Sequence, residues 1–108
     1  MSYYMTQVAY SPEALKSLMK SPQDRTKAIR AAVERLGGRL EGFWLSFGQY
    51  DALLIAELPD NASAAALSLA ATAAGAIRAS ATTTLLTPQE GIVAFKKAAR
   101  SGYRPPGK

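Results

Sequence analysis

The chain has 108 residues, of which 48% are hydrophobic and 19% are charged, and its formal net charge is +5. It contains no cysteine and no histidine, which excludes disulfides, thiolate nucleophiles, imidazole bases and nearly all zinc, haem or iron–sulfur ligation. We therefore expect a globular chain that needs no cofactor and no metal ion.

The basic residues gather near the C-terminus. The last thirteen positions hold five of them: Lys96, Lys97, Arg100, Arg104 and Lys108. A basic tail can bind phosphates, but a solvated terminus explains the same residues, so we expect no nucleic-acid partner. No apolar run approaches the roughly 20 residues that span a bilayer. We expect no membrane association and, without the pattern of a secretory signal, a cytoplasmic location.

The first third of the chain predicts a strand followed by a broken helix. Residues 3–10 are rich in Tyr, Thr and Val, which is typical of a strand. Ser11 and Pro12 supply a helix N-cap and first turn. The segment Ser21-Pro22-Gln23-Asp24 resembles a capping box and predicts a second helix start. An apolar stripe at helical spacing follows: Ala28, Ile29, Ala32, Val33 and Leu36.

A hairpin comes next, ending the helix at Gly37-Gly38 and turning around Gly48-Gln49. In residues 39–47 the side chains alternate, which predicts one face made of Arg39, Glu41, Phe43, Leu45 and Phe47 and another made of Leu40, Gly42, Trp44 and Ser46. Residues 50–58 are apolar on both faces up to Glu57. Both sides of this sheet should therefore be covered.

The last third predicts a helix, a strand and a further helix. Asp60 and Asn61 begin an alanine-rich helix over residues 62–74, and residues 77–86 form a Thr-rich strand. The segment Thr87-Pro88-Gln89-Glu90 is a capping box that opens a helix ending near Ala99. We expect one domain over residues 1–100 and a basic, flexible tail over residues 101–108.

This order of elements predicts an α+β fold, a ferredoxin-like βαββαβ sandwich with an extra C-terminal helix. Right-handed crossovers place both long helices on one face of an antiparallel four-stranded sheet. The other face is too apolar to remain exposed. We therefore predict a homodimer, or a higher homo-oligomer, in which two sheets face each other as an α/β barrel.

Several short motifs, in this order, resemble a known family. They are Ser-Pro-Gln-Asp-Arg at 21–25, Leu-Gly-Gly-Arg-Leu at 36–40, Phe43-Trp44, Gly48-Gln49-Tyr50-Asp51 and Thr87-Pro88-Gln89-Glu90. Over roughly residues 3–90 the chain resembles the GYD domain family of small bacterial proteins, within the dimeric α/β-barrel superfamily. Here Gln49 separates Gly48 from Tyr50, so the signature is Gly-x-Tyr-Asp.

The resemblance implies ferredoxin-like subunits that pair sheet to sheet, and no established activity comes with it. The wider superfamily contains cofactor-free monooxygenases, isomerases, haem-handling enzymes and small-ligand sensors. Fold analogy does not select among these activities.

Tyr50 and Asp51 are the candidate catalytic residues. In a functional interpretation Tyr50 donates a proton and Asp51 acts as a base or hydrogen-bond acceptor. In a structural interpretation Gly48 supplies the turn, and Asp51 accepts from turn amides or pairs with an arginine. The structural interpretation is favoured, because a phenol with no His or Lys beside it in sequence is poorly activated.

The candidate ligand-binding residues are Trp44, Arg78, Ser80 and Thr82. Trp44 would stack a planar ligand, or pack in the core or a dimer contact. Arg78, Ser80 and Thr82 lie on one polar stripe that would line a barrel pocket for an anionic or carbonyl ligand. The same stripe is explained equally well by an edge strand kept soluble or by a polar contact between subunits.

The leading hypothesis is thus a small oligomeric domain whose work is assembly or binding of a small-molecule ligand. The alternative is a cofactor-independent isomerase or monooxygenase-like enzyme. It would use Tyr50, Asp51, Arg78 and Ser80 around an aromatic or carbonyl substrate.

Overall fold

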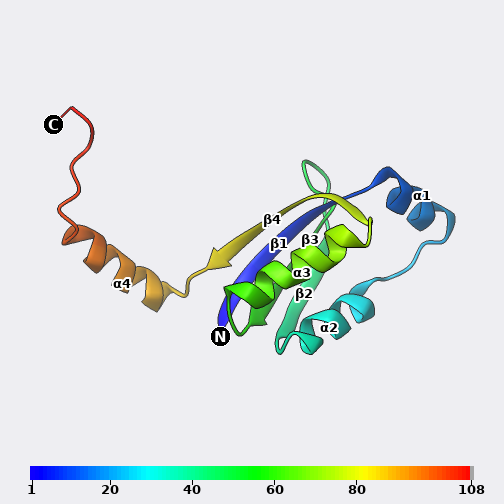
Figure 1. Ribbon diagram of the computed structural model, residues 1–108, viewed down its shortest axis with the longest axis horizontal. Helices are drawn as coiled ribbons and strands as arrows, with labels where there is room; N and C mark the ends of the chain where they lie inside the picture. Colours follow the sequence, from blue (N-terminus) through cyan, green and yellow to red (C-terminus); the bar gives the residue numbers. More distant parts are fainter. Residues whose placement is uncertain (108) are drawn as a thin grey trace.

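The computed structural model describes residues 1–107, which form one antiparallel sheet and the helices packed beside it or extending from it (Figure 1). The strands are β1 (Ser2–Tyr10), β2 (Arg39–Leu45), β3 (Ala52–Leu58) and β4 (Ile77–Leu85). The helices are α1 (Pro12–Lys20), α2 (Thr26–Arg35), α3 (Asn61–Ala73) and α4 (Pro88–Ala99). The strand order β2-β3-β1-β4 confirms the predicted ferredoxin-like fold.

Three helices begin where local capping chemistry predicts. The Ser11 hydroxyl accepts a hydrogen bond from the Ala14 amide at 3.1 Å, and Asp60 accepts one from the Ser63 amide at 2.8 Å. At α4 both halves of the capping box between Thr87 and Glu90 are present. These side chains satisfy amides that the first helical turn leaves without a partner.

The predicted start of the second helix at Ser21 is wrong. The Ser21 amide donates to the Ser17 carbonyl, so this residue ends α1, and α2 begins five residues later at Thr26. Asp24 accepts hydrogen bonds from the amide (2.9 Å) and the hydroxyl (2.6 Å) of Thr26. Its carboxylate therefore closes a local turn before the helix, a competition with helix formation that is common for aspartate.

The core lies between the sheet and the pair α2 and α3, which cover one face of it (Figure 1). Val33 and Leu58 are completely buried at its centre. The other buried members of this cluster are Tyr4, Leu40, Leu54, Ala56, Ala64 and Leu67. Tyr4 donates a hydrogen bond from its hydroxyl to Asn61 Oδ1 at 2.6 Å, which ties β1 to the start of α3.

A β-bulge in β2 overturns the predicted alternation of that strand. Leu40 pairs with Ala56 and Gly42 pairs with Ile55, so Glu41 is an extra residue without a partner of its own. One inserted residue moves every later side chain to the opposite face. Consequently Phe43 and Leu45 share the helix-covered face with Leu40, instead of facing away from it.

The hairpin turn is longer than the predicted Gly48-Gln49 pair. The strands end at Leu45 and resume at Ala52, and residues 46–51 form the loop between them. The Ser46 amide donates to the Asp51 carbonyl at 2.9 Å and closes this loop. Gly48 has a φ of +148°, a conformation that side chains with a Cβ rarely adopt.

The last helix, α4, extends away from the sheet beyond the end of β4 (Figure 1). None of its residues is buried. Ser101–Gly107 follow it outside any helix or strand, and all of them are exposed. Lys108, the last residue of the predicted tail, lies outside the described residues. Among the described helices, none combines the length and the hydropathy needed to cross a membrane.

Candidate functional site

One face of the sheet carries no helix in the part of the chain that the structure describes (Figure 1). We call it the open face. Strand pairing places on it Tyr3, Met5 and Gln7 of β1, Gly42 and Trp44 of β2, Leu53, Ile55 and Glu57 of β3, and Ala79, Ala81, Thr83 and Leu85 of β4. Most of these side chains are apolar. The open face is therefore a wide apolar surface of the kind that usually marks an interaction site.

Trp44 lies flat on this open face. A Cβ added to Gly42 would collide with the six-membered ring of its indole, so glycine at 42 leaves the space that the ring occupies. The Trp44 side chain is nevertheless 52% exposed. A large aromatic ring held against a strand but open to solvent is a typical anchor of an interface.

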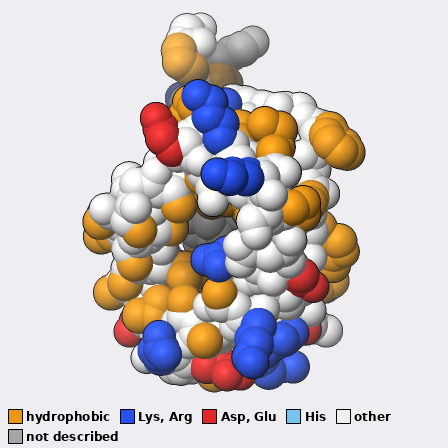
Figure 2. All heavy atoms as spheres, turned by 90° about the vertical axis from the view of Figure 1, so that its right-hand side faces the viewer, with side chains coloured by type: hydrophobic (Ala, Val, Ile, Leu, Met, Phe, Trp, Pro, Cys, Tyr) orange, Lys and Arg blue, Asp and Glu red, His pale blue; other side chains and the backbone are white. Residues whose placement is uncertain are grey.

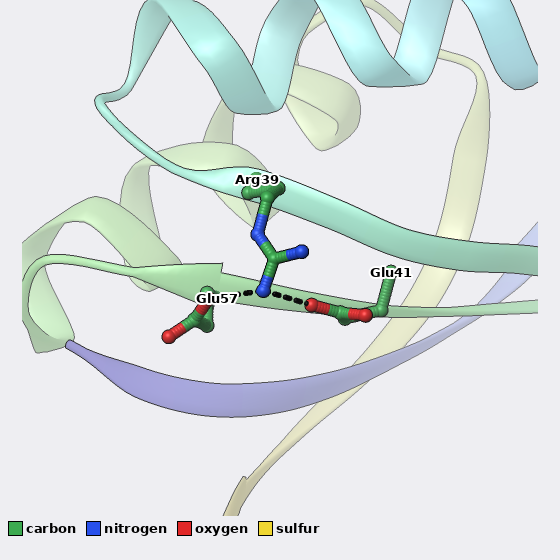
Figure 3. Close-up of polar contacts among 3 residues, drawn as sticks. All are labelled: Arg39, Glu41 and Glu57. Carbon is green, nitrogen blue, oxygen red and sulfur yellow. Dashed lines mark hydrogen bonds and ion pairs between the residues drawn. The ribbon is translucent and has the colours of Figure 1, made fainter.

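A small ion cluster borders the open face where β2 begins (Figure 3). Arg39 Nη2 lies 2.7 Å from a carboxylate oxygen of Glu57 and 2.6 Å from one of Glu41. The Glu57 hydrogen bond, reinforced by the charge of Glu41, raises the pKa of Arg39. Exposed pairs of this kind contribute little stability. The cluster instead leaves one unit of negative charge at this end of the sheet.

On the opposite side of the sheet, a cavity of about 310 Å³ lies between α2, α3 and the strands. Small side chains leave this space: Ala28 and Ala32 on α2, and Ala70 and Ala71 on α3. Phe43 and Val8 supply larger apolar walls. Figure 2 shows the end of the molecule that carries α1, where hydrophobic and Lys or Arg side chains surround a hollow.

Tyr10 from the end of β1 and Arg25 from the segment before α2 line the same cavity, together with Thr6 and Ser68. Burial raises the pKa of Tyr10, Asp51 adds to the rise, and Arg25 acts in the opposite direction. The phenol therefore remains protonated at neutral pH and can donate a hydrogen bond. A mostly apolar cavity with a few polar groups is the usual form of a small-ligand site.

The candidate catalytic pair Tyr50 and Asp51 lies in the hairpin loop. The Asp51 carboxylate accepts a hydrogen bond from the Tyr10 amide at 2.9 Å, and the Asp51 amide donates to the Val8 carbonyl at 2.8 Å. Asp51 thus joins the hairpin to the end of β1. Tyr50 accepts a hydrogen bond at its carbonyl from the Ser46 hydroxyl, and its side chain borders a shallow depression on the open face.

The candidate ligand residues of β4 lie on the other side of the sheet. Ser80 pairs with Val8 and Thr82 pairs with Thr6, so both share the helix-covered face. The Thr82 hydroxyl is 3.2 Å from the hydroxyls of Thr6 and of Ser68 on α3. The structure therefore places Thr82 beside α3 and does not bring it together with Trp44 on the open face.

Arg78 lies apart from that row. The pairing of β1 with β4 shifts at this point, with Ala9 opposite Ala79 and Tyr10 opposite Ile77. Arg78 is the residue left over in β4, and it is exposed. Asp51 and Arg78 thus flank the same end of β1 from opposite sides.

Tyr10 and Arg25 are not among the site residues expected from the sequence. Tyr10 gave a usable signal, because it alternates with Thr6 and Val8 on one face of a predicted strand. Arg25 gave no such signal. The sequence places it inside a helix, whereas α2 begins only at Thr26.

The loop, the sheet and both packed helices fall within one matched region. A family model described as GYD domain matches residues 4–94. The chain belongs to the GYD domain family. The match runs from β1 into α4 and confirms the resemblance that the sequence motifs indicate. No curated protein matches this GYD domain.

Proposed function

We propose that this GYD domain works as a homodimeric binding domain, in which two copies pair through their open faces. The observation that carries the proposal is the open face itself. It presents Trp44, Met5 and Ile55 side by side on adjacent strands, and no helix of residues 1–107 covers them. Sheets that pack face to face lie about 10 Å apart and interlock such side chains into a shared core.

The test compares two substitutions of equal charge on the two sides of the sheet. Ile55→Glu places a carboxylate in the proposed interface, and Thr84→Glu places one on the exposed part of the helix-covered side. We expect Ile55→Glu to raise the dimer dissociation constant by about a hundredfold, because an unpaired charge would be desolvated there. Thr84→Glu should change it by less than about threefold.

The measurement is sedimentation equilibrium, with circular dichroism to show that both variants fold. Folding is expected because Ile55 is only partly buried in the single subunit. Equal dimerisation of the two variants would contradict pairing through the open face.

A second candidate function rests on the cavity between the sheet and the helices. Tyr10 and Arg25 would bind the carbonyl or carboxylate of a small, mainly apolar molecule, and the alanines of α2 and α3 would contact its body. An enzyme acting through Tyr50, Arg78 and Ser80 has less support. Within residues 1–107 no hydrogen bond joins Tyr50 to either of the other two.

Filling the cavity tests this second function. Ala71→Leu points a larger side chain into the space, whereas Ala73→Leu adds the same atoms to an exposed position of α3. With 4-fluorobenzoate as the probe, we expect fluorine NMR to detect binding to the parent chain and to Ala73→Leu, but at least about tenfold weaker binding to Ala71→Leu. Arg25→Gln should weaken it similarly. Binding that is unaffected by both substitutions would rule out this site.

A further inference from the structure

The connection between β4 and α4 is short and closed. Only Leu86 and Thr87 separate the strand from the helix, and Pro88 is the first helical residue. The Thr87 amide donates to Glu90 Oε1 at 2.9 Å, and the Glu90 amide donates to the Thr87 hydroxyl at 3.1 Å. The capping box and Pro88 fix how α4 begins. The helix extends away from the sheet of its own subunit (Figure 1).

Despite that position, α4 carries an apolar stripe. Ile92, Phe95 and Ala99 are spaced as neighbours on one helix face, and Phe95 is 78% exposed. A helix of 12 residues is marginal in water when nothing packs against it. Both observations indicate a helix whose partner is another molecule.

The open face shows why a second copy of this chain is that partner. Strands of seven to nine residues, four abreast, give a sheet with a projected area on the order of 500 Å². Each partner of a standard stable complex buries roughly 800 Å² of accessible surface, a measure that exceeds the projected area of the same patch. Contact from α4 would add to the surface that the two sheets bury.

Exposed apolar residues also continue from the sheet towards the helix. Leu85 pairs with Tyr3 on the open face, Leu86 is exposed, and the Ile92 stripe begins one helical turn further on. Across the same end of the sheet, Tyr3 pairs with Glu57, and Glu57 with Arg39. The acidic excess of the Arg39 cluster thus lies at the end from which the basic helix leaves.

We propose that α4 is an arm that crosses to the second copy in the dimer, where its Ile92 and Phe95 pack against the apolar surface of the partner subunit. Lys97, on the other side of the helix, and Lys96, beside Ile92, then lie near the acidic end of the partner's sheet. This proposal rests on the proposed homodimer and adds to it the part of the chain that completes the interface.

The test places the same charge on the two sides of α4 in the full-length chain. Ile92→Glu enters the apolar stripe, and Ala94→Glu lies on the opposite, exposed side of the helix. We expect Ile92→Glu to raise the dimer dissociation constant by about tenfold or more and Ala94→Glu to change it by less than about twofold. Neither should change the melting of the single subunit, because no residue of α4 is buried in it.

A second readout locates the arm directly. The chain has no cysteine, so Phe95→Cys gives one thiol that a benzophenone maleimide labels, and Ala94→Cys, on the opposite side of α4, is the matched control. Irradiation should link the label at position 95 to residues of the other copy, and the label at position 94 much less.

The outcomes separate the arm from the dimer. If Ile92→Glu dimerises as well as the parent chain, and the label at position 95 crosslinks only within one copy, the arm is overturned and the sheet-to-sheet dimer stands. A monomeric parent chain overturns both. The parent chain could instead bind to phosphatidylserine vesicles. If Ile92→Glu abolished that binding and left dimerisation unchanged, α4 would be assigned to a membrane surface and the proposal would be overturned.

Discussion

Gly38 shows how one residue without a side chain sets the contact between two strands. A Cβ at this position would collide with the Glu57 carbonyl oxygen and would lie 2.6 Å from a methyl carbon of Leu58. Leu58 is completely buried, and the backbone of Glu57 is held by its pairing with Arg39. Neither neighbour can move without disturbing the sheet, so the close approach of the chain after α2 to β3 requires glycine.

We therefore predict that Gly38→Ala lowers the free energy of unfolding by about 1–3 kcal/mol, as overpacking of a rigid site does. Gly91→Ala is the control, since a Cβ there meets nothing within 4 Å. Urea unfolding followed by the fluorescence of Trp44 measures both variants. Equal stability of Gly38→Ala and Gly91→Ala would show that the strands can separate locally at no cost.

At the scale of elements, the features that could be predicted from the sequence are those that depend on local chemistry. The N-caps Ser11, Asp60 and Thr87 act on amides three residues away, and each begins a helix as expected. The bulge at Glu41 depends on contact between distant segments, and the alternation predicted for β2 was wrong. The predicted start of α2 was wrong as well, because the local turn between Asp24 and Thr26 delays the helix. A periodic pattern does not show where one residue has been inserted.

The candidate site divides in the same way. The apolar open face follows from strand alternation and was expected, including the place of Trp44 on it. The cavity beside Tyr10 was not expected, because it forms only where two helices pack on the sheet. No single alanine in the sequence indicates it. Thr82 was a candidate for a barrel pocket, a soluble edge strand or a polar contact between subunits, and its position next to Ser68 results from how α3 packs beside β4.

The bulge gives a prediction about an element. Deleting Glu41 would remove the extra residue and leave Leu40 and Phe43 on the helix-covered face by simple alternation, so it should cost little stability. Deleting Ile55 from β3 would instead turn either Leu54 or Leu58 to the open face. Exposing one of these buried side chains should cost about 2 kcal/mol of stability.

Thermal and urea unfolding of the two deletion variants give the comparison. A chain without Glu41 that is as unstable as one without Ile55 would contradict the assignment of Glu41 as the extra residue of β2.

At the scale of the whole molecule, the chain divides its surface into parts with different chemistry. The helix-covered face holds the core and a small cavity, the open face is apolar, and α4 extends beyond the sheet. A single subunit leaves Trp44, Ile92 and Phe95 exposed together, which is more apolar surface than a monomer usually presents. Pairing of two copies explains all of these exposed residues by one arrangement.

The most direct test is the mass of the unmodified chain in solution. Sedimentation equilibrium at micromolar concentration should give twice the 11.5 kDa mass of one chain, or a higher multiple of it, and acrylamide should quench the Trp44 fluorescence less as the protein is concentrated. A mass of one chain throughout that range, with Trp44 equally accessible at every concentration, would contradict the account.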